Sequence, residues 1–406
     1  MTYTVVHDAV EVVTGPADEN DETLQTETDA AVIVEDGTVS AVGPSAEITT
    51  EYPLTDADTI VDASGQCVLP GFVDSHTHAL FVGDRSEEFE AKLAGRSYQE
   101  ILADGGGILR TVRNVREATD DELAAQLRKH LDVMLVNGTT TAEVKSGYGL
   151  DTDTELRMLA VIDRVNETHP VDLVPTFMGA HAVPDDGTSE AYTNSIITEQ
   201  LPAVADQGLA EFCDVFCEAD VFSVEQSRRI LTVGQEHGLT PKIHADEFVR
   251  LGGSQLAAEV SAASADHLLQ STSEDAASLV NSGVTPTFLP GTAFGLDGNY
   301  PAIAPYQERG TIPAIATDFN PNCYAPTLGF AATLACVGVG MTPAQAVRGI
   351  TDRGAAALNR TDGRGTVRAG APGDLVVLDA PTYRHLPYKY DGTLVDTVLK
   401  NGSIVH

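Results

Sequence analysis

Residues 70–80 read Pro-Gly-Phe-Val-Asp-Ser-His-Thr-His-Ala-Leu and are the most informative part of the chain. The apolar pair Val68 and Leu69 precedes them, which predicts a buried strand running into His76 and His78. Side chains alternate along a strand, so the two imidazoles lie on one side, about 6–7 Å apart. An HxH triplet also arises by chance in a chain with 11 histidines. The apolar strand ahead of it nevertheless favours half of a metal site at a barrel strand's end.

The length and composition indicate a globular protein with more than one folding unit. The chain has 406 residues, of which 42% are hydrophobic, and this suits a barrel of about 250–300 residues with a smaller appended domain. There is no run of 18 apolar residues, so no membrane span is predicted. Residues 1–8 have neither a basic start nor an apolar core, so no export signal is predicted and a cytoplasmic location is expected.

The formal net charge of −36 argues against partners that are themselves acidic. Nucleic acids and anionic membranes would be repelled by this much negative charge. The acidic residues are spread over the whole chain and do not form one tail. We therefore interpret them as a solvated surface adapted to high salt, as in the cytoplasm of a halophile, where screening removes most self-repulsion.

The five cysteines are odd in number and scattered, at Cys67, Cys213, Cys217, Cys323 and Cys336. The pair at 213 and 217 has no second Cys or His pair nearby that would complete a zinc site. Buried free thiols in a reducing compartment are expected.

Short strands are predicted at both ends of the chain. Asp36-Gly37 separates two apolar segments and is a strong hairpin signal. The acidic stretch 18–22 is expected to be a solvated loop. The predicted terminal strands are residues 4–6, 9–13, 31–35, 39–43, 375–379, 395–400 and 403–405. We expect them to form one small β-sandwich domain of residues 1–64 plus 365–406, into which residues 65–364 are inserted.

Between the termini, strand patterns alternate with amphipathic helix patterns. The candidate strands lie near residues 68–75, 139–144, 172–178, 211–216, 241–244, 264–268, 284–288 and 313–318. Helical stretches include residues 121–136, 154–167, 224–237 and 273–281, with Asp120 or Asp121 as the cap of the first. Eight alternating units predict an α/β fold with a (β/α)8 TIM-type barrel. An open doubly wound sheet is the alternative, but no dinucleotide fingerprint follows an early strand, and the glycines at 105–107 suit a loop over the site.

Four of the predicted strands end in residues that can bind a metal ion. His76 and His78 end the first strand, and His244 ends the fifth. His267 ends the sixth and Asp318 the eighth. Each of the last three, taken alone, would more often be a core or capping residue. A closed barrel brings all these ends to one axis, and three His with one Asp suit zinc or ferrous iron.

This pattern, with a β domain built from both termini, resembles the amidohydrolase superfamily and, within it, the imidazolonepropionase family. The resemblance covers nearly the whole chain. HxH is specific only to the superfamily, whereas residues 143–149 (EVKSGYG) and 178–184 (MGAHAVP) narrow it to the family. The other matching segments are residues 74–78, 83–85, 244–247, 265–267 and 317–321.

The resemblance implies one metal ion per subunit, divalent or trivalent, either zinc or iron. The matching ligands are His76, His78, His244 and Asp318. Binuclear relatives use a carboxylated Lys from the fourth strand, but residues 211–216 contain no Lys. Lys145 follows the second strand instead and is expected to have a structural or electrostatic role.

The implied reaction is the hydrolytic ring opening of 4-imidazolone-5-propanoate to N-formimidoyl-L-glutamate in histidine degradation. A bound metal ion provides a nucleophilic water at neutral pH. The expected catalytic residues are Glu247, His267 and Asp318, with Asp318 or His267 as the general base. His267 is placed to polarise the carbonyl, and Glu247 to bind the ring N–H and carry a proton to the leaving nitrogen.

The resemblance also assigns contacts to the organic ligand. Arg85 offers a planar fork for the propanoate tail, and Tyr148, His181 and Glu247 are the other expected substrate contacts. Product contacts are expected from Tyr148, Asn320, Asn322 and Cys323. After Asp-x-Asn-Pro the family commonly has Gly and then Ser or Thr, so Asn322-Cys323 departs from the pattern. The Cys thiol is a weaker donor than a hydroxyl, although backbone contacts survive such a change.

Two alternative functions are consistent with some of these sequence features. A mononuclear nucleobase or aminohydrolase-type deaminase has the same metal motif but no need of an Arg for a carboxylate tail. A non-catalytic metal-binding scaffold would have lost part of the set, yet every strand-end residue is present. The expected partner is a small molecule with a propanoate tail, with no nucleic acid and no membrane, and a homodimer is expected from the family.

Overall fold

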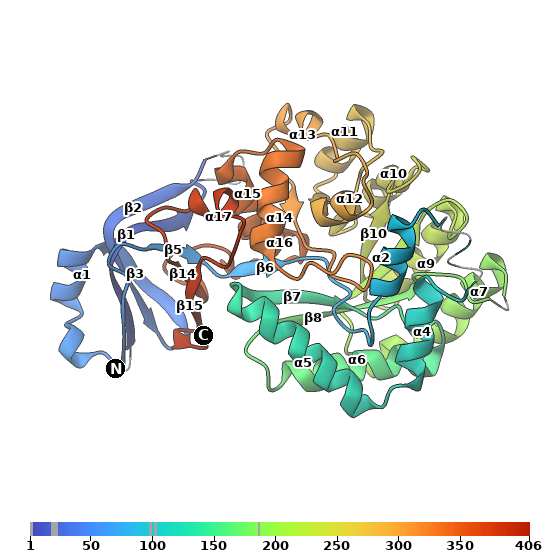
Figure 1. Ribbon diagram of the computed structural model, residues 1–406, viewed down its shortest axis with the longest axis horizontal. Coiled ribbons are helices and arrows are strands. Elements are labelled where there is room, and N and C mark those ends of the chain that lie inside the picture. The colour runs from blue at the N-terminus through green and yellow to red at the C-terminus, as the bar shows by residue number, and fades with distance from the viewer. Residues whose placement is uncertain (1–2, 18–22, 97–99, 101–103, 186) are drawn as a thin grey trace.

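The computed structural model describes residues 3–17, 23–96, 100, 104–185 and 187–406. Within them the chain forms two eight-stranded sheets. One sheet contains strands from both ends of the chain and lies at one side of the molecule, next to both termini; the other is surrounded by helices (Figure 1). The predicted acidic loop at 18–22 lies outside the described residues.

The terminal sheet confirms that strands from the two ends of the chain fold together. Its order is β16-β15-β14-β5-β1-β2-β3, with β4 also paired to β1. The bounds are β1 Tyr3–Gly15, β2 Gln25–Glu35, β3 Thr38–Pro44, β4 Thr59–Asp62, β5 Cys67–Pro70, β14 Leu375–Leu378, β15 Val395–Lys400 and β16 Ser403–Ile404. Asp36 and Gly37 both have positive φ in the β2–β3 turn, as the predicted hairpin requires. Residues 4–6 and 9–13, expected as two strands, are one strand with an irregularity between Val6 and Ala9.

The inner side of this sheet is apolar on strands from both termini. Val6, Val32 and Val68 are fully buried and pack with Val377 and Leu399. Strands that are remote in sequence therefore share one hydrophobic core, as expected for a small β-sandwich domain.

The second sheet is a parallel barrel in strict sequence order, β6 to β13. The bounds are β6 Phe72–Asp74, β7 Thr139–Lys145, β8 Asp172–Ala180, β9 Phe212–Cys217, β10 Thr240–Ala245, β11 Ser264–His267, β12 Thr285–Phe288 and β13 Ala314–Ile315. Seven of the eight predicted barrel strands each correspond to one of these, and the first corresponds only in part. The TIM-type barrel is confirmed.

The first predicted strand, residues 68–75, is wrong as a single element. β5 pairs with β1 and β14 in the terminal sheet, whereas β6 pairs with β7 in the barrel. Gly71 lies between them, and a Cβ there would be 2.2 Å from Thr140 Oγ1, so the chain can cross this closely only at a glycine. We propose that the two domains meet at Gly71 and, near the other end, close to the predicted residue 365.

The segments that follow the first and last barrel strands are hydrogen-bonded to each other, so the barrel is nearly closed. The Asp318 N–H donates to the His76 carbonyl at 3.0 Å, and the His78 N–H donates to the Phe319 carbonyl at 2.9 Å. Below them, the Thr317 hydroxyl donates to Asp74 Oδ2 at 2.7 Å. These bonds place HxH beside Asp318, although about 240 residues separate them in the chain.

Helices cover the outside of the barrel (Figure 1). Helix α1 Ser45–Glu51 instead packs on β2 and β3 of the terminal sheet. The other helices are α2 Ser86–Leu93, α4 Ile108–Glu117, α5 Asp120–Val136, α6 Thr152–Asn166, α7 Ser189–Ser195, α8 Leu201–Gln207, α9 Val224–Glu236, α10 Gly253–Glu259, α11 Ser273–Asn281, α12 Pro290–Gly295, α13 Ala304–Gln307, α14 Leu328–Leu334, α15 Pro343–Gly349, α16 Asp352–Ala357 and α17 His385–Tyr388. Thr119, not Asp120 or Asp121, caps α5, because its hydroxyl accepts the Glu122 N–H in a capping box. In the described part of the chain, no helix has the length and apolar character needed to span a bilayer.

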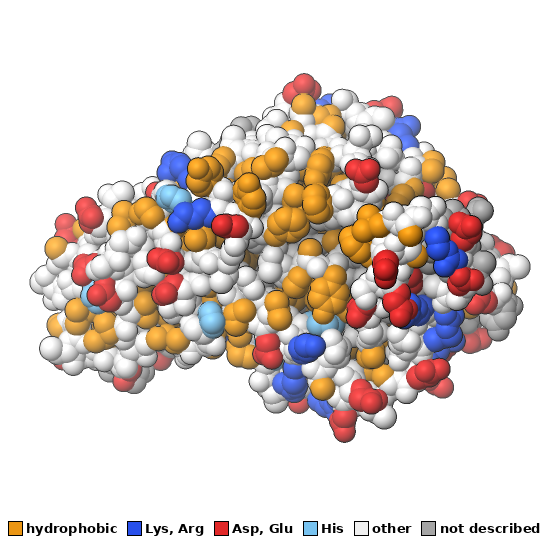
Figure 2. All heavy atoms as spheres, in the orientation of Figure 1, with side chains coloured by type: hydrophobic (Ala, Val, Ile, Leu, Met, Phe, Trp, Pro, Cys, Tyr) orange, Lys and Arg blue, Asp and Glu red, His pale blue; other side chains and the backbone are white. Residues whose placement is uncertain are grey.

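All five cysteines are free thiols, as predicted, and Cys336 is the one that is not fully buried. On the face seen in Figure 2, acidic side chains are spread over both the terminal sheet and the barrel, with no single acidic patch. The surface therefore carries its negative charge diffusely, and screening acts on the molecule as a whole.

We expect the melting temperature to rise by several degrees between about 0.1 M and about 1 M KCl, because the Debye length falls from about 10 Å to about 3 Å. The 60 acidic residues outnumber the 24 basic ones, so screening removes net repulsion from the compact state. Scanning calorimetry at each salt concentration measures the change, and sucrose at equal osmolality controls for general solute exclusion. Equal melting temperatures at both salt concentrations would contradict the adaptation to high salt.

Candidate active site

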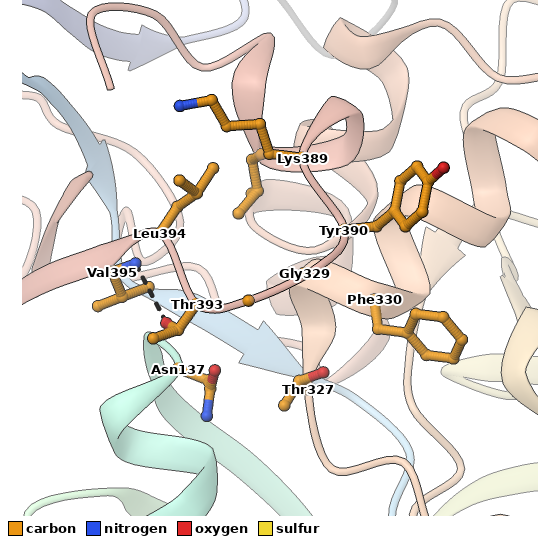
Figure 3. Close-up of a pocket in the computed structure, with 11 residues that line it drawn as sticks. Asn137, Thr327, Gly329, Phe330, Lys389, Tyr390, Thr393, Leu394 and Val395 are labelled. Carbon is orange, nitrogen blue, oxygen red and sulfur yellow. Dashed lines mark hydrogen bonds between the residues drawn. The ribbon is translucent and has the colours of Figure 1, made fainter. Parts of the chain in front are cut away.

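Two hollows stand out in the structure. The smaller, of about 300 Å³, lies between α14, α17 and residues 389–395 (Figure 3), where the Val395 N–H donates to the Thr393 hydroxyl at 3.2 Å. No predicted site residue is among the described residues that line it. The larger cavity, of about 670 Å³, is lined by strand-end residues of the barrel. Ten predicted site residues line it: His78, Arg85, Tyr148, His181, His244, Glu247, His267, Asp318, Asn320 and Asn322.

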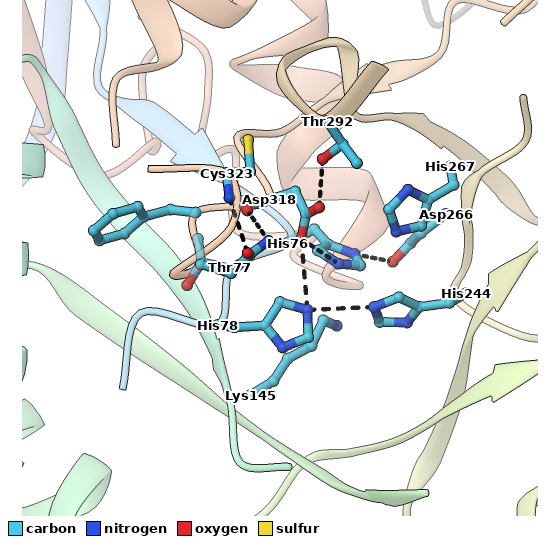
Figure 4. Close-up of polar contacts among 12 residues, drawn as sticks. His76, Thr77, His78, Lys145, His244, Asp266, His267, Thr292, Asp318 and Cys323 are labelled. Atoms are coloured by element: carbon cyan, nitrogen blue, oxygen red, sulfur yellow. Dashed lines mark hydrogen bonds and ion pairs between the residues drawn. The ribbon is translucent and has the colours of Figure 1, made fainter. Parts of the chain in front are cut away.

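Three histidines and one carboxylate converge at the bottom of the larger cavity (Figure 4). Nitrogen atoms of His76, His78 and His244 lie within 4.8 Å of one another. His244 Nε2 is 3.3 Å from His78 Nε2, and Asp318 Oδ1 is 3.5 Å from the Nε2 atoms of both His76 and His78. Ligand atoms 2.0–2.1 Å from one ion at tetrahedral angles are about 3.3–3.4 Å apart. The observed separations therefore match the edges of a metal-binding tetrahedron.

Two histidines of the cluster have the protonation state that a cation requires. Burial, and then the charge of Lys145, hold the pKa of His76 well below its usual range, and burial does the same for His78. Both rings are therefore neutral and can bind through Nε2. His76 Nε2 is buried without a hydrogen-bond partner among the described residues, which is costly unless a ligand occupies that place.

Buried carboxylates orient two of these histidines. Asp266 Oδ2 is 2.6 Å from His76 Nδ1, and Asp214 Oδ1 is 3.0 Å from His244 Nδ1. Such contacts fix the ring orientation and the tautomer, so that Nε2 faces the centre of the histidine cluster. Asp318 is held in the same way, because the Thr292 hydroxyl donates to its Oδ2 at 2.5 Å and leaves Oδ1 toward the histidines.

A fully buried network of charges lies beneath the histidines. Lys145 Nζ is 2.6 Å from Asp214 Oδ2 and 2.7 Å from Glu143 Oε2. Although burial opposes it, these two carboxylates raise the pKa of Lys145. Lys242 lies 3.4 Å from Glu143 and donates to the Ser75 carbonyl at 2.9 Å. Lys145 thus contacts Asp214 and, through it, supports His244, a position that suits the structural or electrostatic role expected from the sequence.

Glu247 and His267 line the cavity beside the His76, His78, His244 and Asp318 cluster. His267 Nε2 is 3.7 Å from Glu247 Oε2. Glu247 is 8% exposed and lies in an irregular loop after β10, so it is not a surface acid at a helix start. Burial, and then Asp318, raise the pKa of Glu247 well above its usual range, so this group can hold a proton near neutral pH. Burial also lowers the pKa of His267, which keeps the ring neutral.

Arg85 enters the cavity from the residue before α2. Its Nη2 and Nε lie 2.6 and 2.8 Å from Glu88 Oε2. Glu88 also accepts the Gly107 N–H at 3.0 Å, so the glycine segment 105–107 is tied to the support of Arg85 and is not a phosphate cradle. This fixed guanidinium is the arginine that the sequence assigned to the propanoate tail.

Tyr148 and His181 lie together on the side of the cavity next to His78. The His181 ring stacks on His78 with centroids 4.6 Å apart, and Tyr148 lies 5.2 Å from His181. His181 Nδ1 is 3.0 Å from the Gly147 carbonyl, and burial lowers its pKa to about 3. Both residues are therefore neutral and offer ring edges to a ligand.

Asn322 and Cys323, which depart from the family pattern after Asp318, lie in a turn that the Asn320 side chain holds. Asn320 Oδ1 accepts the N–H groups of Asn322 and Cys323 at 2.8 and 3.0 Å. The Cys323 thiol points to the Thr317 carbonyl at 3.7 Å, and burial raises its pKa to about 12. Asn320 and Asn322 line the cavity, but Cys323 does not. A polar contact from the Cys323 side chain to a ligand is thus not supported.

The sequence reasoning missed several residues of this site: Lys92, Glu88, Asp214, Asp266 and Thr292. Asp214 and Asp266 could have been found, since isolated acids in buried parallel strands need a partner. Asp266 directly precedes His267 in the sequence. Nothing local to Thr292 or Lys92 indicates that they approach the site.

Comparison with known proteins agrees with this geometry. A model of the Amidohydrolase family matches residues 67–405. Imidazolonepropionase of Haloarcula marismortui is 60% identical, covering 99% of this chain and 95% of that protein. The chain belongs to the imidazolonepropionase family. Other members of the family include those of Halobacterium salinarum, at 58% identity over 98% of this chain and 97% of that protein, and Clostridium tetani, at 47% identity over 93% and 90%.

Solved structures with a similar fold are more distant in sequence. Guanine deaminase of E. coli has a TM-score of 0.75 at 15% identity, covering 100% of this chain and 99% of that one. An adenosine deaminase from Xanthomonas campestris with bound zinc has a TM-score of 0.75 at 17% identity, covering 99% and 92%. At such identities the likeness shows the fold alone.

Proposed function

We propose that this protein hydrolyses the ring amide of 4-imidazolone-5-propanoate and releases N-formimidoyl-L-glutamate. The observation that carries the proposal is that one cavity is lined both by the His78, His244 and Asp318 cluster and by the Arg85 guanidinium. A small ring with a carboxylate tail needs both features. The family membership supports the same reaction.

We propose one metal ion per subunit, zinc or iron, held by His76, His78, His244 and Asp318. The separations of their ligand atoms and the unpartnered His76 Nε2 support this set. Strand β9 has no Lys that could bridge a second ion. When bound, the ion supplies a nucleophilic water at neutral pH and polarises the carbonyl.

The protein's own residues then have distinct tasks. Asp318 would hold the ion through Oδ1 and accept the proton of the attacking water on Oδ2, because the Thr292 hydroxyl occupies only one lone pair of that oxygen. His267, a neutral imidazole beside the cluster, donates its N–H to the carbonyl oxygen as negative charge develops there. Glu247, whose pKa is raised, passes a proton to the ring nitrogen as the C–N bond breaks. Arg85 binds the tail and orients the ring against these groups.

The direct test supplies freshly prepared imidazolonepropanoate to the metal-loaded protein and follows the loss of its ultraviolet absorbance. We expect turnover with formation of N-formimidoyl-L-glutamate. If the substrate is left intact and ammonia is released from a purine or pyrimidine, the protein is a deaminase and the proposal is wrong. If neither reaction occurs, a metal-binding scaffold is favoured.

Replacing Arg85 by Met is expected to lower kcat/KM about 100-fold, because a charge-assisted contact to the tail is lost. Steady-state kinetics at saturating metal measures the effect. The double variant Arg85→Met with Glu88→Gln controls for the carboxylate left unpaired in the single variant. Arg85→Lys should recover only part of the activity, since Lys lacks the planar fork. An unchanged kcat/KM in Arg85→Met would remove this residue from the site.

We infer a homodimer from the family resemblance and a cytoplasmic location from the sequence. A homodimer is tested by light scattering at molar salt, and a cytoplasmic location agrees with the free thiols.

A further inference from the structure

Helix α2 presents one stripe of side chains to the substrate cavity. Arg85, Phe89 and Lys92 are four and three residues apart, a spacing that places them on one face of a helix. All three line the cavity. Glu88, on the same side, is buried behind Arg85. The helix that follows the carboxylate-binding arginine thus carries a second cation into the same space.

The first cation of this stripe is already neutralised. Arg85 directs both Nε and Nη2 to Glu88 Oε2, and Glu88 is only 5% exposed. The pair carries little net charge into the cavity, since one buried carboxylate balances one guanidinium. A substrate carboxylate that met Arg85 alone would compete with Glu88 for the same fork.

Lys92 is not neutralised in this way. Its Nζ donates to Asn322 Oδ1 at 2.9 Å, and within the described chain no carboxylate oxygen lies within 4.0 Å of it. An ammonium has three donors, so two remain for a ligand. Lys92 is half-buried, and burial followed by the nearby Arg85 lowers its pKa. Because the charge of Arg85 affects the pKa of Lys92, and both side chains line the cavity, the two cations act on the same region of it.

This state is unusual for a lysine in so acidic a chain. There are six lysines against 60 acidic residues. The three buried ones, Lys145, Lys242 and Lys400, each contact carboxylates. A half-buried ammonium without such a partner, facing a cavity, is electrostatically incomplete until an anion binds there.

We propose that Lys92, held in place by the Asn322 side chain, is a second cationic contact for the carboxylate tail of the substrate. The inference rests on the proposed function. Arg85 would bind one carboxylate oxygen and Lys92 the other, so the tail is recognised by its charge and not only by its length. Asn322 stands where the family pattern has glycine, which offers no side chain to orient a lysine. Lys92 is thus a specificity residue created by the departure in the loop after Asp318.

The position predicts a particular kinetic effect. The tail keeps its charge throughout ring opening, so a contact to it stabilises the bound substrate and the transition state equally. Lys92→Met should therefore raise KM about tenfold while kcat changes by no more than about twofold. Lys92→Arg should recover most of the affinity, because it restores the charge.

The decisive experiment measures binding without turnover. Calorimetry on the metal-loaded, full-length protein compares imidazole-4-propanoate with imidazole-4-propanamide, which has the same shape and no charge. We define the ratio as the affinity for the propanoate divided by the affinity for the propanamide. We expect this ratio to fall about tenfold in Lys92→Met and about threefold in Asn322→Gly, which keeps Lys92 but removes the side chain that orients it. Lys129→Met, which removes an exposed lysine from α5, is the matched control and should leave the ratio unchanged.

The outcomes separate this inference from the proposed function. If the wild-type protein does not hydrolyse imidazolonepropanoate but the ratio still falls in Lys92→Met, the reaction is wrong and the carboxylate contact stands. If hydrolysis occurs and the ratio in Lys92→Met equals that of the wild type, the inference is overturned. Should Lys92→Met fail to fold, as seen from its melting temperature, Asn322→Gly and Lys92→Gln provide the same comparison.

Discussion

Replacing Asp318 by Asn is expected to lower kcat by about four orders of magnitude. The residue is proposed both as a metal ligand through Oδ1 and as the acceptor of the water proton, and general-base catalysis alone accounts for about 10²–10⁴-fold. Asn has almost the same shape, but its amide cannot take up the proton. Single-turnover kinetics at saturating metal, with the metal content measured on the same sample, separates loss of the ion from loss of the base.

Thr292→Val is the matched companion to this variant. It removes the hydrogen bond to Asp318 Oδ2 and keeps the carboxylate, so we expect a loss of about tenfold in kcat. If metal-saturated Asp318→Asn keeps more than about 1% of the wild-type kcat, the general base is another residue, and His267 becomes the first candidate.

Replacing Lys145 by Met is expected to destabilise the fold by about 3–5 kcal/mol, because buried Asp214 loses its lysine and Glu143 loses the nearer of its two. Asp214 Oδ2 and Glu143 Oε2 lie 2.6 and 2.7 Å from Lys145 Nζ, and all three side chains are fully buried. Urea unfolding at constant molar salt measures the change in the free energy of unfolding. Since Asp214 orients His244, we also expect metal affinity to fall about 10–100-fold.

The double variant Lys145→Met with Asp214→Asn distinguishes the two effects. Removing the charge of Asp214 together with that of Lys145 should restore part of the stability. It should not restore metal affinity, because the His244 ring has lost its carboxylate. A double variant that recovers both properties would show that Lys145 acts on the metal site only through stability. A Lys145→Met protein as stable as the wild type would contradict the role of the buried network.

The local sequence was sufficient for most elements of the barrel. Residues 139–144 (TTTAEV) are rich in β-branched residues and 172–178 (DLVPTFM) are mostly apolar, both lie between helix patterns, and β7 and β8 include them. The predicted helix at 273–281 coincides with α11. Such segments form because hydrophobic periodicity and end signals act within a few residues of the chain.

The segment around Gly71 shows where local pattern is insufficient. Val68 and Val73 are equally apolar, and nothing in their spacing indicates that they belong to different sheets. The division follows from β14, which arrives from the far end of the chain to pair with β5. Pairing partners are set by the packing of whole sheets, so one apolar run can be shared between two cores.

The sequence by itself determined the residue types of the proposed metal site, because HxH, His244 and Asp318 each follow a recognisable strand. It also determined the acidic surface and the absence of a fourth-strand lysine. Only the tertiary structure decided which charges lie beneath and beside that site. Lys145, Asp214 and Thr292 meet their partners through strand register and barrel closure, and Lys92 reaches Asn322 across 230 residues. A charged residue in a buried strand or loop shows that it needs a partner. The identity of that partner depends on which distant segments of the chain pack against it.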